Sequence, residues 1–115
     1  MLANTITIPH ADGDIVVVRK TEKDGTSTYK LLEPTRATSL AIRHTSTQGS
    51  LTKPAKERHN IEVIETTYAT ESTPEFVQKA YLVHEHSPMD LDVKIPAALC
   101  TMLTATANAM LLQLL

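Results

Sequence analysis

The hydrophobic periodicity of this chain changes once, near residue 91, and this change constrains the fold more than any other feature. Before it, short runs alternate apolar and polar residues as β-strands do, and turn residues separate them with no helical segment between. After it, apolar residues recur at helical spacing among alanines. Strands that are joined by turns alone form an antiparallel meander. The sequence therefore predicts an α+β fold in a single domain, 1–115, with an N-terminal β-hairpin at 1–20, an antiparallel meander sheet at 27–88 and C-terminal helices at 91–115.

Turn residues set the bounds of the predicted strands. Gly13 can supply a positive φ between the two strands of the hairpin. Ile15 to Val18 show little alternation, so we expect this strand to be covered on both faces, with a second subunit as the candidate cover. The predicted strands are Thr5–Pro9, Asp14–Lys20, Ser27–Leu32, a strand from Ser39 to about Thr47, Arg58–Tyr68 and Phe76–His86.

A basic strand–loop–strand segment lies in the middle of the chain. Within residues 36–60 five basic residues accompany one acid, a local charge of +4 in a chain whose net charge is −2. Strand alternation places Leu40 and Ile42 on one side and Arg43 on the other, and Arg58 opens a second run of the same kind. One apolar face and one basic, hydroxyl-rich face predict a sheet that is covered on one side. The other side would bind an anion, which we take to be RNA.

The segment after residue 91 is apolar nearly all round, since no charged residue follows Lys94. Pro96 suits the first turn of a helix, and Thr104–Asn108 is expected to kink the helix or divide it in two. A helix of this profile is buried on more than one side, and in so short a chain the expected cover is a second copy. The predicted dimer-interface residues are Ile95, Leu99, Met102, Leu103 and Met110.

Several classes of protein are disfavoured by what the sequence contains. Cys100 is the single cysteine, which excludes an internal disulfide and weakly favours a reducing compartment. The N-terminus has no basic region followed by an apolar stretch, so no signal peptide is expected. Thr, Asn and Gln interrupt the apolar C-terminus short of the roughly 18 unbroken residues of a membrane span. We therefore predict no membrane partner.

The sequence gives little sign of catalysis. His84 and His86 lie on one face of a predicted strand at a spacing that can hold a metal, but they share that face with Leu82 and should point toward the helices. They are predicted to be core or subunit-interface histidines, and the other three histidines form no ligand grouping by sequence. The glycines are isolated and no Ser/His/Asp arrangement is present. We predict no metal, no cofactor and no enzymatic activity.

The order of elements resembles the coat proteins of single-stranded RNA bacteriophages, the leviviruses. The segment KAYLVHEHSP (Lys79–Pro88) leading into an apolar helix, and the basic strand–loop–strand of Ser39–Glu65, carry this resemblance. It covers most of the chain as an order of elements. In that family two subunits join their sheets and their helices clasp the partner across the outer face. The opposite face lines the capsid and binds genomic RNA and, in better-known members, a stem–loop whose occupancy represses replicase translation.

Carried over by strand position, the resemblance implies which residues face the RNA. Basic side chains would neutralise phosphates and Tyr81 would stack on a base. Ala69–Pro74 would form the loop around the capsid symmetry axes. The chain departs from the family in a long Gln48–Lys56 loop and in Val83, where some members place a polar base-reading residue. The implied RNA-binding residues are Arg43, Thr45, Thr47, Lys56, Arg58, Asn60, Tyr81, Val83 and Glu85.

The resemblance thus implies a homodimer that assembles into an icosahedral capsid around single-stranded RNA. It also implies a location in the virion, after assembly in the cytoplasm of a bacterial host. The first alternative is a non-viral dimeric module that binds RNA and regulates translation. The second is a small metal-dependent enzyme that uses His84 and His86.

Overall fold

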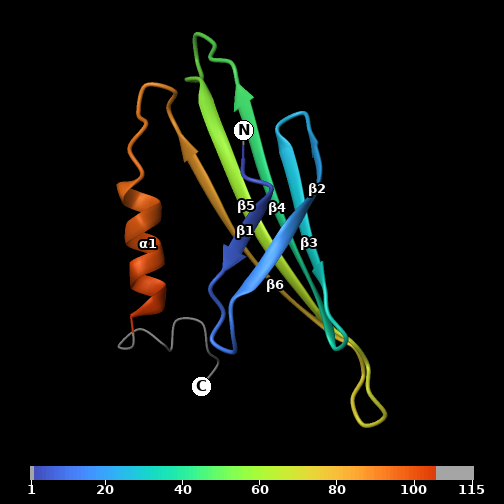
Figure 1. The fold of residues 1–115 in the computed structure, drawn as a ribbon. Coiled ribbons are helices and arrows are strands. Elements are labelled where there is room, and N and C mark those ends of the chain that lie inside the picture. Colours follow the sequence, from blue (N-terminus) through green and yellow to red (C-terminus); the bar gives the residue numbers. More distant parts are fainter. Residues whose placement is uncertain (1, 106–115) are drawn as a thin grey trace.

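A computed structural model describes residues 2–105 of the chain (Figure 1). Within that range six strands form one antiparallel sheet in sequence order, and one helix follows. This agrees with the predicted α+β class and meander. The strand β6 coincides with its predicted bounds. The elements are β1 (Thr5–Ile8), β2 (Ile15–Lys23), β3 (Thr26–Leu32), β4 (Arg36–Thr47), β5 (Lys56–Thr67), β6 (Phe76–His86) and α1 (Lys94–Thr104).

The N-terminal hairpin is continuous with the rest of the sheet. β2 pairs with β1 on one side and with β3 on the other, and it continues to Lys23 rather than ending at Lys20. The register between β2 and β3 shifts between Arg19 and Thr21. Such a bulge bends a strand and increases its twist. The bend lets the first half of β2 and the strand β1 pack against the core of the sheet.

The sheet has two unlike faces, which we call the core face and the open face. The core face carries the buried side chains Ile15, Val17, Tyr29, Leu40 and Ile42. Tyr29 is almost fully buried, and its hydroxyl donates a hydrogen bond of 2.6 Å to the carbonyl oxygen of Ala3. The N-terminal segment is thus tied over the core face by a polar contact as well as by apolar packing.

The strand β2 is covered on one face within the described part of the chain, and cover of its other face by a second subunit stays a prediction. Ile15 and Val17 are 2% and 0% exposed, whereas Val16 and Val18 are each 44% exposed. The two valines lie on the open face, where the described part of the chain supplies little cover. The lack of alternation in this run therefore does not reflect burial of both faces within one subunit.

The helix α1 begins at Lys94, three residues later than predicted. Asp92 precedes it, and its Oδ1 accepts a hydrogen bond of 2.7 Å from the Lys94 backbone N–H. The helix ends at Thr104, where Ala105 is extended. The segment 104–108, where a kink or a break was predicted, thus begins at the last residue of α1. Met110 lies outside the described residues. Between residues 2 and 105 no helix is both long and apolar enough to cross a membrane.

No residue of α1 is buried, although its sequence is largely apolar. The helix lies beside the sheet on the core-face side of β5 and β6 (Figure 1). Ile95 is 78% exposed and Met102 is 44% exposed. The expected burial of this helix on several sides is therefore not met by contacts within the described part of the subunit.

The turn between β2 and β3 yields a test of the fold. Asp24 and Gly25 have φ angles of 52° and 77°, as a two-residue hairpin turn requires, and a Cβ on Gly25 would lie 2.8 Å from the His44 carbonyl oxygen. We expect Gly25→Ala to lower the free energy of unfolding by about 2 kcal/mol or more. Gly13→Ala is the control, because its φ is also positive but its Cβ would meet no atom within 4 Å. Urea denaturation measures both losses, that of Gly13→Ala giving the cost of backbone strain without a clash, and a Gly25→Ala loss below about 1 kcal/mol would contradict the role of the His44 contact.

Candidate nucleic-acid interface

The strand register brings the predicted RNA-facing residues onto one surface. Side chains of directly opposed residues in an antiparallel pair project from the same face. All nine predicted residues therefore lie on the open face of β4, β5 and β6, although their binding to RNA remains a prediction. The rows across these strands are Arg43–Asn60–Val83, Thr45–Arg58–Glu85, Thr47–Lys56 and Ala41–Glu62–Tyr81.

The open face of these three strands is positively charged on balance. It carries four cations and two carboxylates, an excess of two positive charges per chain. Arg58 and Lys56 are exposed, and Arg43 is half-buried. The hydroxyls of Thr45 and Thr47 lie beside these cations and are exposed. Cations and hydroxyls spread over three strands are suited to a polyanion that runs across the sheet.

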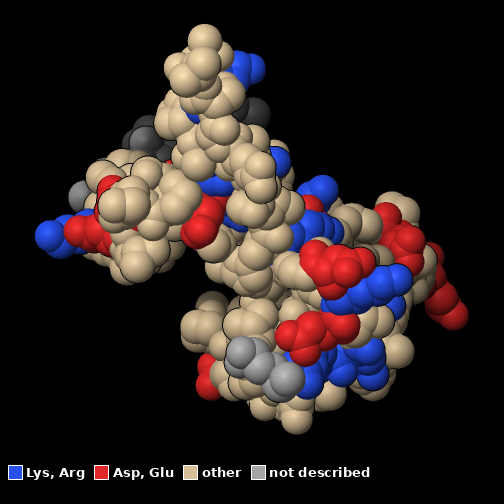
Figure 2. Space-filling view, turned by 90° about the horizontal axis from the view of Figure 1, so that it is seen from above, with Lys and Arg blue, Asp and Glu red and all other residues tan. Residues whose placement is uncertain are grey.

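The cations are partly neutralised by carboxylates of the same face. Glu62 lies 3.7 Å from Arg43 Nη2 and 3.3 Å from Lys79 Nζ, and Glu85 lies 3.5 Å from Lys56 Nζ. Figure 2, which views the molecule from above, shows Lys and Arg beside Asp and Glu rather than one unbroken basic surface on that side. The pair of Lys56 and Glu85 is open to solvent, and such pairs contribute little stability, so a phosphate can replace the Glu85 carboxylate at low cost. Glu85 thus acts here as a partner for Lys56.

Two further side chains on the open face are suited to contacts with bases. Tyr81 is 65% exposed, and Lys79 Nζ lies 5.7 Å from the centroid of its ring. The ring is more exposed than that of a half-buried sheet tyrosine, so one of its faces is accessible for stacking. Asn60 Oδ1 is buried and has no hydrogen-bond partner in the described part of the chain. A buried acceptor of this kind is usually satisfied, and a donor from a bound molecule would reach it only after neighbouring side chains move.

Sequence reasoning missed two residues of this surface, Glu62 and Lys79. Both carry the parity of the open face, Glu62 with Asn60 along β5 and Lys79 with Tyr81 along β6. Alternation alone could therefore have placed them there. Alternation could not predict the ion pair between Glu62 and Lys79, because that pair depends on which residues of β5 and β6 lie opposite each other.

The core face of the same strands gathers histidines that the sequence did not group. His44 lies opposite His59 and His59 opposite His84. The Nδ1 atoms of His44 and His59 are 2.6 Å apart, and the Nε2 atoms of His59 and His86 are 2.9 Å apart. No pattern in the sequence had indicated that His44 and His59 lie together. Burial, aided by the neighbouring His44 and His86, lowers the pKa of His59.

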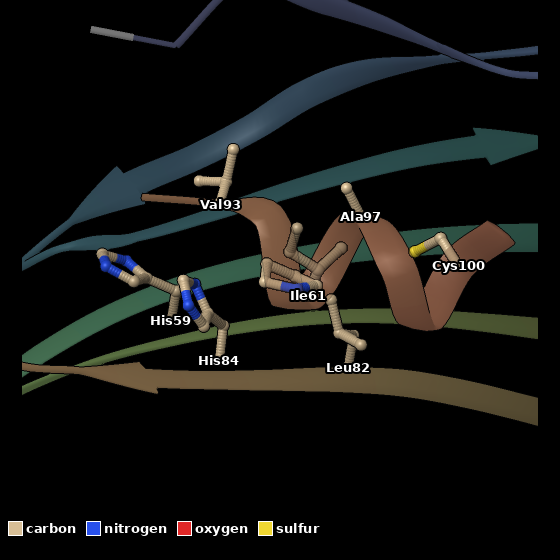
Figure 3. A pocket seen from close by; sticks show the side chains of 8 residues that line it. His59, Ile61, Leu82, His84, Val93, Ala97 and Cys100 are labelled. Carbon is tan, nitrogen blue, oxygen red and sulfur yellow. The ribbon is translucent and has the colours of Figure 1, made fainter. Parts of the chain in front are cut away.

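Two of these histidines, His59 and His84, border a cavity of about 310 Å³ between α1 and the sheet. Figure 3 shows that His59, Ile61, Leu82 and His84 approach it from β5 and β6, while Val93, Ala97 and Cys100 approach it from the helical side. The prediction that His84 points toward the helix is confirmed. Nearly all of this lining is apolar, so the helix and the sheet face each other across apolar surfaces that do not meet.

Comparison with protein families gives a match that covers most of the chain. A protein-family model described as "Phage phiCb5, coat protein" matches residues 3–87. The matched span begins before β1 and ends one residue after β6, so it takes in all six strands of the sheet. No curated protein matches the chain.

Proposed function

The chain belongs to the phage phiCb5 coat protein family and so has a structural role in a phage capsid, and on this premise we propose that it dimerises and packages single-stranded RNA on the open face of its sheet. The observation that carries the proposal is the row of cations and hydroxyls across β4, β5 and β6. We further propose that the phage is a levivirus and that its capsid is icosahedral and assembles in the cytoplasm of the host bacterium.

Binding of genomic RNA needs cations placed for many phosphates rather than for one. Arg43, Lys56 and Arg58 lie in successive rows of the open face, so one strand of RNA can contact them in turn. Phosphate contacts of this kind supply most of the affinity and are insensitive to sequence. Lys79 adds a fourth cation beside Tyr81. A two-fold axis would double this surface in the dimer.

The same face could recognise a particular RNA stem–loop and act as a translational repressor. The exposed ring of Tyr81 favours stacking of an unpaired base. The unpaired Oδ1 of Asn60 is buried, so it would accept a hydrogen bond from a base only after neighbouring side chains move. Val83 lies opposite Asn60, next to Tyr81 on the same face of β6, and offers apolar contact alone. We place this activity second, because packaging needs only the charge.

The proposed dimer joins two sheets edge to edge through β6. This strand is eleven residues long, lies at an end of the strand order and has no strand on its outer side in the described chain. An exposed edge of this length would pair with other chains unless it were covered. Phe76, Val77 and Tyr81 along it are 57%, 60% and 65% exposed. Antiparallel pairing with the partner's β6 would satisfy the edge and cover apolar surface.

The helix α1 supports the clasp because it is apolar on two opposite sides. Val93, Ala97 and Cys100 face the cavity between helix and sheet. Ile95, Leu99 and Met102 have the same spacing but start two residues later, which places them about 200° round the helix. A helix that is apolar on both sides is suited to burial between two surfaces. We propose that one is its own sheet and the other belongs to the partner, with Leu103 half-buried at the boundary.

Electron microscopy of the purified protein, with sequencing of the RNA inside any particles, tests the proposed function. Closed particles of uniform diameter that contain RNA are the expected result. Soluble dimers that bind RNA without forming particles would instead support the alternative of a regulatory module.

Removal of open-face cations should weaken RNA binding and its dependence on salt. We expect Arg43→Ala combined with Arg58→Ala to flatten the slope of log K against log salt by about 0.7 for each phosphate that the protein no longer neutralises. Fluorescence anisotropy with a labelled single-stranded RNA, over a series of salt concentrations, measures this slope. An unchanged slope would rule out the open face as the phosphate-binding surface.

Two matched variants sharpen that measurement. Lys94→Ala removes one charge from α1, where Asp92 is its ion-pair partner, and should leave the slope unchanged. Glu62→Gln removes the carboxylate beside Arg43 and Lys79 and should strengthen RNA binding. Weaker RNA binding by the arginine variant and stronger binding by Glu62→Gln, with no change in Lys94→Ala, would show that the charge of the open face controls binding. An effect of the net charge of the chain would also appear in Lys94→Ala.

The outward stripe of α1, formed by Ile95, Leu99 and Met102, allows a test of the dimer. In the proposed dimer Leu99→Asp buries an unpaired charge at a cost of several kcal/mol, which should abolish folded dimer. Thr101→Asp adds the same charge to the polar side shared with Lys94 and should leave the dimer intact. Analytical ultracentrifugation reports both results. A Leu99→Asp chain that still dimerises, or that remains a soluble folded monomer, would contradict the clasp.

A further inference from the structure

The core face holds a group of metal-ligating atoms that the RNA surface does not use. The carboxylate of Glu57 and the rings of His59 and His86 place one ligand atom each within 4.8 Å of one another. His86 Nε2 lies 2.9 Å from His59 Nε2 and 3.6 Å from a Glu57 oxygen. Ligands bound to Zn²⁺ at 2.0–2.1 Å are about 3.3 Å apart in a tetrahedron, so the two distances bracket the required value.

We propose that Glu57, His59 and His86 bind a Zn²⁺-type divalent cation, one per chain. Two imidazoles and one carboxylate form a ligand set known for zinc, with a fourth position left for water. Nitrogen ligands disfavour Ca²⁺ and Mg²⁺, which take oxygen. The site lies on the face opposite the proposed RNA surface and takes all its protein ligands from one chain. It therefore does not depend on RNA binding.

Hydrogen bonds behind the ligands already orient the two rings. His86 Nδ1 donates to the Ser87 carbonyl oxygen over 2.8 Å, so in the neutral ring Nε2 carries a lone pair directed at His59. Such a bond from the far nitrogen to a backbone carbonyl is the usual support of a metal-bound histidine. His59 has the equivalent support from His44, whose Nδ1 lies 2.6 Å from its own Nδ1.

Zn²⁺ can bind without loss of a ring proton from His44, His59 or His86, because the protons only change the nitrogen that carries them. In the metal-free protein His44 Nδ1–H donates to His59 Nδ1, and His59 Nε2–H donates to His86 Nε2. Zn²⁺ takes the place of the proton between His59 and His86. That proton moves to His59 Nδ1, where His44 Nδ1 accepts its hydrogen bond, and the proton of His44 moves to its own Nε2. The lowered pKa of His59 keeps its ring in the neutral form that ligates.

A bound ion would tie down the end of β6. His86 is the last residue of that strand and His59 belongs to β5, so the metal would link the two where the chain leaves the sheet for α1. His59 also borders the cavity beneath the helix (Figure 3). The ion would thus stabilise the position from which the helix departs.

Isothermal titration of the full-length chain with Zn²⁺, after chelator treatment and dialysis, tests the site. We expect one Zn²⁺ per chain at micromolar affinity or better, a rise of Tm with Zn²⁺, and no displacement by excess Ca²⁺. His86→Gln and Glu57→Gln should each weaken Zn²⁺ binding about 100-fold, and His44→Gln about tenfold. His10→Gln is the matched control, because His10 lies outside the cluster and should leave the affinity unchanged.

Glu57→Gln decides the question if His86→Gln does not fold, because the Glu57 side chain is 38% exposed and its substitution disturbs no core packing. Zn²⁺ affinity unchanged in Glu57→Gln, or reduced equally in His10→Gln, would overturn the proposal. So would the absence of binding to the native chain at micromolar Zn²⁺. RNA binding by the same variants should match the native chain, which separates a failure here from a failure of the RNA surface.

Discussion

The direct opposition of β4, β5 and β6 is the constraint on which the rest of the molecule depends. Because side chains alternate along a strand and opposed residues share a face, one register separates two chemistries. The row through Arg43 and Asn60 faces one way, while the row through His44 and His59 faces the other. A slip of one residue would place the cations among the apolar core and the histidines in solvent. Burial of Leu40 on the core face makes such a slip costly.

The two ends of the sheet use different means to cover the core face. At the N-terminal end the chain supplies its own cover, since the hairpin and the segment before it pack over Tyr29 and its neighbours. At the β5–β6 end the helix stands away from the sheet, and Ile61 remains 43% exposed beneath it. Exposed apolar surface of this extent is typical of an interaction site. One half of the subunit thus covers its own core face, and we propose that the other half contacts a second chain.

The sequence predicted local features well and relations between distant segments poorly. Pro74 and Pro88 bracket β6, so its bounds and its parity followed from alternation alone. The start of β4 was missed because residues 36–38 show no apolar alternation. The nine open-face residues share one face as predicted, because parity is a local property. The meeting of His59 with His44 and His86 was missed because it depends on register across a loop and a turn, which no local pattern encodes.

The two edges of the sheet differ greatly in length, since β1 has four residues and β6 has eleven. In the dimer that we propose, pairing of β6 with its own copy about a two-fold axis uses the one long edge in the described part of each chain, and growth of the sheet then stops. Fibres, which need two equivalent edges on every chain, are thereby disfavoured. Further assembly must proceed through loops and surfaces other than backbone pairing. Contacts of that kind are individually weaker, and so misplaced subunits can dissociate before a shell closes.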